Sequence, residues 1–304
     1  MLAPRRIAFI NEKGGSAKTT LVANLAAYLA MHRGRRVLAI DMDPQGQLGK
    51  VLGVDVHRPR RSAIDMLLDA VLGEPPRDPT RRDSVRGFDD LGGSSDPVSI
   101  LPISHTQIPR LDVVVANKSL ALAPALDADP SSETTQRLLK ALERAPELDS
   151  YDFVFFDAPP SFGALTLNVL CAAQEIVVPV PLTYLAMDGC AELLRTVATV
   201  RTRYGNPDIR ITMVVPTFYR RTKLAHEILD KLKARFKKEI AHTVVGYHVK
   251  IDEAQSRGMS IFEYAPRDRA AKVMAELAEE LELRGHDPLT EDELAGSRGG
   301  RERP

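Results

Sequence analysis

Short apolar runs alternate with longer amphipathic stretches along most of this chain of 304 residues. The runs that predict strands are 7–10, 37–40, 111–115, 154–156, 176–180, 211–215 and 243–245. The stretches that predict helices are 19–32, 62–71, 132–145, 165–171, 190–203, 223–236 and 267–283. Alternation of this kind predicts an α/β fold with a doubly wound, mostly parallel sheet and helices on both faces.

One segment interrupts this regular alternation. Residues 74–110 are rich in proline, glycine and charge, and a long irregular segment in a compact domain is typically a surface insertion. The C-terminal residues 286–304 are polar and carry glycine and arginine, a composition typical of disorder. We therefore expect one domain over residues 1–285, with an insertion at 74–110 and a disordered tail.

The first predicted strand leads into a glycine turn and then into a helix. The turn reads Asn-Glu-Lys-Gly-Gly-Ser-Ala-Lys-Thr-Thr over residues 11–20. In such a loop, backbone N–H groups and a helix N-terminus converge on an anion. Lys18 would place a positive charge at the β- and γ-phosphates, and the Thr19 hydroxyl would ligate Mg²⁺. The sequence therefore predicts a site for ATP with Mg²⁺.

Ala17 stands where a phosphate-binding loop of the strict kind has glycine. If this position requires a positive φ, alanine costs roughly 1 kcal/mol there. We expect ATP binding to survive that cost.

Carboxylates follow two of the other predicted strands. Asp41 and Asp43 end the second strand in Asp-Met-Asp-Pro-Gln-Gly, and Asp157 ends the apolar run 153–156. ATP hydrolysis needs a group that orients the attacking water and an acceptor near Mg²⁺. Ligands of open α/β sheets lie at the carboxyl ends of the strands, where these aspartates are expected.

The net charge does not indicate a binding partner, because 41 Lys and Arg residues balance 41 Asp and Glu residues. Nucleic-acid binding would therefore need a local patch, and residues 217–250 supply one. Its cations are Arg220, Arg221, Lys223, Lys231, Lys233, Arg235, Lys237, Lys238 and Lys250. The expected helix 223–236 has a buried stripe of Leu224, Ile228, Leu232 and Phe236, which leaves its lysines outside. Binding to DNA phosphates and simple exposure of this helix face to solvent explain these lysines equally well.

A second lysine, Lys13, precedes the glycine pair, and K-G-G-x-x-K-[ST] is the deviant Walker A pattern of the ParA/MinD group. Asp-Met-Asp-Pro-Gln-Gly over 41–46 resembles switch I of ParA proteins, and Asp-Ala-Pro-Pro over 157–160 resembles their switch II. Glu-Ala-x-x-x-Gly-x-Ser-Ile over 253–261 matches a segment near the ParA C-terminus. The chain thus resembles ParA/Soj-type partition ATPases from residue 6 to about 283, apart from the insertion.

This resemblance implies an ATPase switch. Lys13 would reach the partner's nucleotide in a homodimer that sandwiches two ATP molecules, Asp43 would serve hydrolysis, and Asp157 would hold Mg²⁺ through water. Arg221 and Lys250, with Arg220 and Lys223 beside them, would contact nonspecific DNA. A ParB-like or other adaptor protein would stimulate a slow intrinsic hydrolysis, and the protein would be cytoplasmic and nucleoid-associated. The nucleotide-binding residues implied are Lys13, Gly14, Gly15, Ser16, Ala17, Lys18, Thr19, Thr20 and Asp157. Gly246 departs from the family, in which proline stands at this position, so the adenine contacts stay open.

Three other functions of the same fold remain as alternatives. A MinD-like membrane ATPase needs a C-terminal amphipathic helix, and the last ten residues contain no bulky apolar side chain. We therefore expect no membrane association. An iron–sulfur reductase needs cysteines at a shared cluster, and Cys171 lies in an apolar run that favours packing. A metabolic ATP-dependent ligase would not need Lys13.

Overall fold

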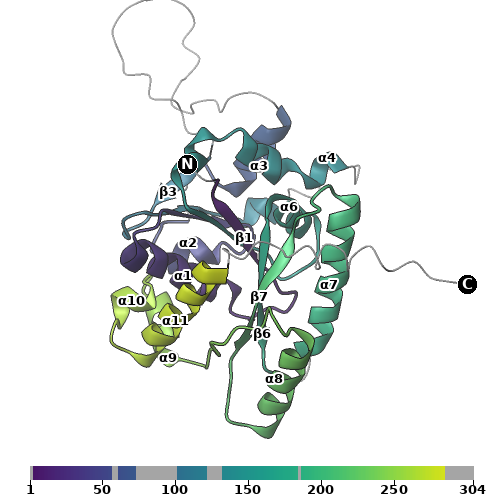
Figure 1. The fold of residues 1–304 in the computed structure, drawn as a ribbon. Helices are drawn as coiled ribbons and strands as arrows, with labels where there is room; N and C mark the ends of the chain where they lie inside the picture. Colours follow the sequence, from purple (N-terminus) through teal and green to yellow (C-terminus); the bar gives the residue numbers. More distant parts are fainter. Residues whose placement is uncertain (1–2, 57–60, 73–100, 122–131, 184–185, 285–304) are drawn as a thin grey trace, which may run out of the picture.

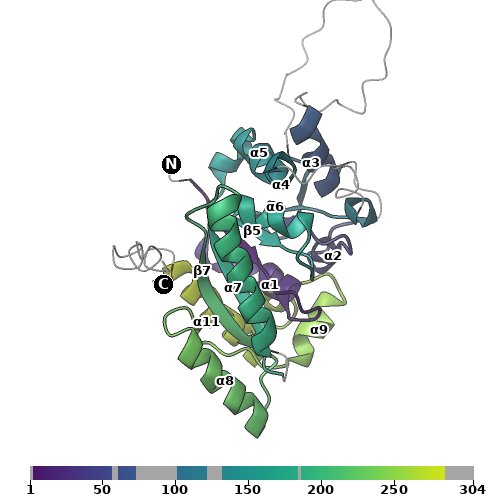
Figure 2. The same cartoon turned by 90° about the vertical axis from the view of Figure 1, so that its right-hand side faces the viewer.

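A single sheet runs through the molecule, with helices on both of its faces (Figures 1 and 2). The computed structural model describes residues 3–56, 61–72, 101–121, 132–183 and 186–284. Seven strands of this part pair in the order β3-β4-β2-β5-β1-β6-β7. They are β1 Arg5–Phe9, β2 Val37–Asp41, β3 Ile103–His105, β4 Leu111–Val114, β5 Phe153–Asp157, β6 Glu175–Pro181 and β7 Arg210–Thr217. Only β3 is antiparallel to its neighbour, which confirms the predicted mostly parallel α/β sheet.

The helices bury two separate apolar layers against the sheet. One layer packs under α1, α10 and α11, and the other packs under α3, α5, α6, α7 and α8. Because both faces are covered, the central strands are buried throughout, as β2 and β5 are. The helix bounds are α1 Lys18–Arg33, α2 Gln47–Val51, α3 Ala63–Leu72, α4 Ser132–Thr135, α5 Arg137–Glu143, α6 Ala164–Ala172, α7 Ala186–Arg203, α8 Lys223–Arg235, α9 Val249–Gln255, α10 Ile261–Tyr264 and α11 Arg269–Arg284, with a 3₁₀ turn over Pro146–Ser150.

The structure differs from the sequence prediction at three places. The predicted strand 243–245 is wrong. The chain on either side of it makes isolated bridges, Ile240 with Val214 of β7 and Gly246 with Tyr219, and residues 243–245 form no strand. The predicted helix 132–145 is two helices, because the backbone leaves helical geometry at Gln136. Residues 101–110, expected in the insertion, contain β3, whose backbone pairs with β4 at the sheet edge. Residues 74–100 and 286–304 lie outside the described residues.

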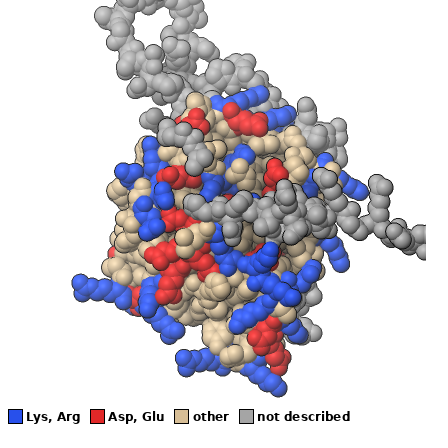
Figure 3. Space-filling model, viewed as in Figure 1, with Lys and Arg blue, Asp and Glu red and all other residues tan. Residues whose placement is uncertain are grey.

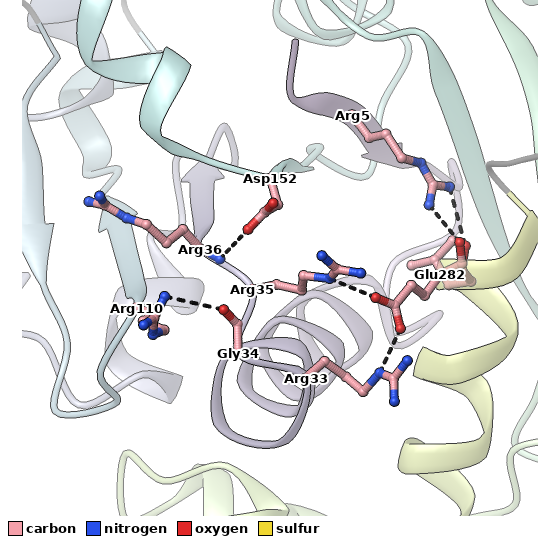
Figure 4. A network of polar contacts seen from close by, with 9 residues as sticks. Arg5, Arg33, Gly34, Arg35, Arg36, Arg110, Asp152 and Glu282 are labelled. Atoms are coloured by element: carbon pink, nitrogen blue, oxygen red, sulfur yellow. Dashed lines mark hydrogen bonds and ion pairs between the residues drawn. The ribbon is translucent and has the colours of Figure 1, made fainter. Parts of the chain in front are cut away.

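A polar network at the amino ends of the strands fastens the last helix to the first (Figure 4). Glu282 of α11 is 6% exposed and accepts hydrogen bonds of 2.7 Å from both Arg33 and Arg35. Arg5 pairs with Glu175 at 2.8 Å and donates to backbone carbonyls at the end of α11. Burial would raise the pKa of Glu282, but Arg35 and Arg33 outweigh it and lower that pKa. The network therefore holds α11 across the edge of α1.

Candidate active site

The carboxyl ends of β1, β2 and β5 meet at one edge of the sheet and carry the predicted site. Asp41 at the end of β2 lies opposite Asp157 at the end of β5 in the strand register. The loop after β1 enters α1 at Lys18, and the next residue, Thr19, bonds to Asp157. The topology therefore brings together the glycine loop and the strand-end aspartates that the sequence analysis singled out.

The loop has the backbone shape of an anion cradle. Gly15 has φ 68° and Ala17 has φ 75°, so two left-handed residues curl the chain before α1. A Cβ built on Gly14 or Gly15 would meet no atom within 4 Å, so the loop is open on that side. Ala17 therefore does occupy the conformation that favours glycine, and the loop carries this strain in the region that would face a phosphate.

The two lysines of the loop are held differently. The buried ammonium of Lys18 donates to the carbonyl oxygen of Asn11 at 2.9 Å, within the loop. The ammonium of Lys13 instead donates to the hydroxyl of Thr183, after β6, at 2.8 Å. Burial lowers the pKa of Lys18, although the carboxylates of Asp157 and Asp43 act in the opposite direction. Lys18 is thus built into the cradle, whereas Lys13 lies toward the neighbouring loop.

Asp157 and Thr19 form the pair that a magnesium ion would require. The Thr19 hydroxyl donates to Asp157 Oδ2 at 2.6 Å, and the buried Oδ1 of the same carboxylate has no hydrogen-bond partner in the part of the chain that the structure describes. Burial raises the pKa of Asp157 to about 7, while Thr19 and Lys18 oppose that rise. A buried, underused carboxylate oxygen beside a hydroxyl is a fitting donor set for Mg²⁺ or its bound water. When bound, the ion would neutralise phosphate charge.

Asp41 and Asp43 occupy different environments although they are two residues apart. Asp41 is fully buried and accepts backbone N–H bonds of 3.0 Å from Asp43 and Leu48. Asp43 is half-buried, and among the described residues its Oδ1 accepts the backbone N–H of Gln45. Burial, and next the charge of Asp157, raise the pKa of Asp41 well above its usual range. Asp41 therefore shapes the loop, and Asp43 is the aspartate left with a carboxylate oxygen to use.

The predicted DNA contacts lie on the segment between β7 and α8, in the first turn of α8 and in the first turn of α9. A bridge between Tyr219 and Gly246 brings the segments before α8 and α9 together, and Arg220 is close enough to Tyr247 to act on its pKa. Lys250 follows in the first turn of α9 and is half-exposed, paired with Glu253 at 2.7 Å. Arg221 and Lys223 are exposed at the start of α8, which lies at one end of the molecule in Figures 1 and 2.

The stripe predicted for the basic helix is correct in three of its four positions. Ile228, Leu232 and Phe236 are buried, but Leu224 is 45% exposed. Leu224 stands in the first turn of α8, where the buried position is taken by Ala225 instead. Figure 3 shows Lys and Arg side chains interspersed with Asp and Glu on one face of the molecule, as equal totals would give.

Three side chains of the site were not identified from the sequence. Asn11 holds the loop, because its amide donates to the carbonyl of Pro179 at 2.6 Å and its Oδ1 accepts the Lys13 N–H. Its place directly after a strand and before a glycine turn is a signal that could have found it. Thr183 and Gln255, which donates to the Thr20 hydroxyl at 2.8 Å, come from distant segments and carry no such signal.

Together, the parallel sheet, the open glycine loop and the paired Thr19 and Asp157 define a P-loop ATPase that uses ATP and Mg²⁺. The sequence matches the family described as an AAA domain over residues 4–211. It is 34% identical over 280 residues to the sporulation initiation inhibitor protein Soj of Bacillus subtilis, covering 92% of this chain and 98% of that protein. It is 38% identical over 281 residues to the chromosome-partitioning ATPase Soj of Thermus thermophilus, covering 92% and 96%. The chain belongs to the Soj/ParA family of partition ATPases.

Solved structures share this fold. The cobyrinic acid a,c-diamide synthase of Mycobacterium smegmatis with bound ADP and magnesium matches with a TM-score of 0.68 at 27% identity, over 99% of this chain and 98% of that one. An ATP complex of McdA from Cyanothece matches with a TM-score of 0.73 at 16% identity, over 95% and 100%, which shows the fold alone. Among the described residues, no helix has the length and apolar character needed to cross a bilayer.

Proposed function

We propose that the protein is an ATP-dependent dimeric switch for partition or positioning. In its ATP state the dimer binds nonspecific DNA, and hydrolysis stimulated by a ParB-like or other adaptor protein releases it. Repeated release and rebinding at the nucleoid then move a chromosome, a plasmid or a protein assembly. The Thermus thermophilus relative is a chromosome-partitioning ATPase, which supports this role.

The observation that supports a dimer is the direction in which the Lys13 side chain points. Its ammonium bonds to Thr183 and not to the loop carbonyl that Lys18 uses, so the chain has a second cation beside the cradle. A hydroxyl is a weak partner for an ammonium compared with a phosphate, and Lys13 would exchange it for the nucleotide of a second copy. Each copy would then complete the site of the other.

The test is Lys13→Ala, with Lys272→Ala as the matched control because Lys272 is an exposed lysine of α11. We expect Lys13→Ala to abolish ATP-dependent dimerisation in sedimentation while the control dimerises as the unaltered protein does. An Lys13→Ala protein that still dimerises with ATP would disprove the sandwich.

A second candidate is ATP-dependent biosynthetic chemistry, favoured by the 27% identity to the diamide synthase over nearly the whole chain. The two functions differ in what accelerates ATP turnover. A partition switch responds to DNA together with an adaptor, whereas a synthase responds to a small acceptor molecule. Turnover that is insensitive to DNA and to any adaptor would favour the second candidate.

A further inference from the structure

Two polar contacts join the start of α1 to the α9–α10 unit, which we define as residues 249–264. Gln255, the last residue of α9, donates its amide N–H to the hydroxyl of Thr20 at 2.8 Å. Asn24 is buried, donates to the carbonyl of Thr20 and accepts the N–H of Ile261 at the start of α10, both at 2.8 Å. Thr20, the last residue of the phosphate loop, is therefore held directly by this unit.

The same unit also touches the helix that follows Asp43. Gly258 has φ 66°, and a Cβ built on it would lie 2.9 Å from the Cα of Gly53 and 3.1 Å from the carbonyl oxygen of Lys50. No side chain fits there, so the backbone of the α9–α10 junction rests on the end of α2. The unit thus contacts both segments that are expected to sense the nucleotide.

Two cations of the unit gather around one aromatic ring on its outer surface. Lys250 lies 5.7 Å and Arg257 lies 4.7 Å from the ring centre of Tyr264. Glu253 accepts hydrogen bonds of 2.7 Å from both Lys250 and the Tyr264 hydroxyl. Glu253 thus fixes both the Lys250 ammonium and the ring against which Arg257 lies, so both cations are held in defined positions.

We propose that α9 transmits the state of the phosphate loop to this surface, with the Gln255–Thr20 hydrogen bond as the joint and Arg257 as a further DNA-phosphate contact beside Lys250. This inference rests on the proposed DNA-binding function.

The physical basis is the hydroxyl of Thr20. It already accepts from Gln255, so its own hydrogen is left to donate toward the phosphate loop. A phosphate acceptor on that hydrogen polarises the hydroxyl and strengthens the bond from Gln255. The end of α9 is then held more firmly against α1, and Lys250 and Arg257 are fixed with it. ATP can favour the firmly held position of α9 only if it makes different contacts in the two positions, and this hydrogen bond supplies that difference.

The experiment compares Gln255→Leu with Gln255→Glu and with a matched control, Gln107→Leu at an exposed glutamine between β3 and β4. Leucine removes the bond, whereas glutamate reverses it, because a carboxylate would accept the Thr20 hydrogen that the phosphate otherwise accepts. Binding of a short random-sequence DNA duplex is measured with and without saturating ATP, together with ATP affinity with and without DNA.

We expect Gln255→Leu to weaken DNA binding in the ATP state about 5-fold or more, and to weaken ATP binding without DNA as well, because ATP strengthens the bond that leucine removes. By linkage, DNA should then no longer tighten ATP binding in Gln255→Leu or in Gln255→Glu, while Gln107→Leu keeps the coupling. A Gln255→Leu protein with the original ratio of DNA affinities would overturn the proposed connection, as would full coupling in Gln255→Glu.

The paired variant Lys250→Glu/Arg257→Glu separates the two proposals. If this paired variant loses DNA binding while Gln255→Leu behaves as the unaltered protein, the proposed DNA-binding surface is supported and the proposed coupling through Gln255 is wrong. If it binds DNA normally in both nucleotide states, the DNA-binding surface itself is wrong and the coupling falls with it.

Discussion

Asp41 and Asp43 show how burial divides the work of two like residues. Asp41 is committed to backbone N–H groups of its own loop, and Asp43 keeps a carboxylate oxygen in a half-buried position. The sequence could place both at a strand end, because an apolar run followed by Asp-x-Asp-Pro predicts a strand and a turn. It could not rank them from spacing alone, since only the resemblance favoured Asp43.

Asp43→Asn tests the role of that carboxylate without dismantling the loop. The amide oxygen of asparagine can still accept the Gln45 N–H, as Asp43 Oδ1 does at 3.0 Å. We expect ATP binding to persist and stimulated hydrolysis to fall about 100-fold or more, which is the usual contribution of a group that assists proton transfer. The measurement is phosphate release at saturating ATP, and normal release by Asp43→Asn would exclude the assignment.

Ala17 is the residue at which local conformation and residue type disagree. Its φ of 75° belongs to the left-handed region, so Ala17→Gly should raise the free energy of unfolding by about 0.5–1 kcal/mol. The same substitution at Ala198, an exposed position inside α7, should lower it by a similar amount. Urea unfolding of the nucleotide-free protein measures both, and equal signs for the two variants would contradict the explanation.

At the scale of elements, length decided what the sequence could predict. Long elements such as α1 and α11 have enough apolar repeats to be located within a few residues. The short elements α2, α9, α10 and β3 were missed, because so few residues carry too little periodic signal. The capping box of Ser260 and Glu263 was available as a local signal for α10. Contacts that join such elements, like Gln255 with Thr20, depend on the tertiary fold alone.

The fastening of α11 to α1 gives a pH-dependent contribution to stability (Figure 4). Glu282 has a lowered pKa in the folded protein, so the stability that its ion pairs add is present above the unfolded pKa of about 4.3 and is lost as pH falls through the folded value. Glu282→Gln should therefore lower the free energy of unfolding by about 1–3 kcal/mol at pH 7.

The measurement is urea unfolding of both proteins between pH 7 and pH 3. The difference between unaltered protein and Glu282→Gln should begin to shrink as pH falls below the unfolded pKa of about 4.3, and should vanish below the lower folded pKa, where Glu282 is protonated in both states. Glu276→Gln is the control, since Glu276 is an exposed residue of the same helix whose partner lies 3.9 Å away. A difference that stays constant over this range would mean that packing, and not charge, accounts for the loss.

At the scale of the whole molecule, balanced charge means that DNA affinity must arise from the arrangement of a few cations. Arg221→Glu together with Lys250→Glu should abolish binding to random-sequence DNA while ATP-dependent dimerisation persists. Before binding is lost, as in the single variants, the slope of log affinity against log salt should become shallower by about 0.9 for each phosphate contact removed. The control pair Lys118→Glu and Lys272→Glu changes net charge equally at exposed positions outside this surface. If the control pair weakens binding as much, the overall charge and not the surface around α8 and α9 governs the affinity, and loss of dimerisation in the first pair would show damage to the fold.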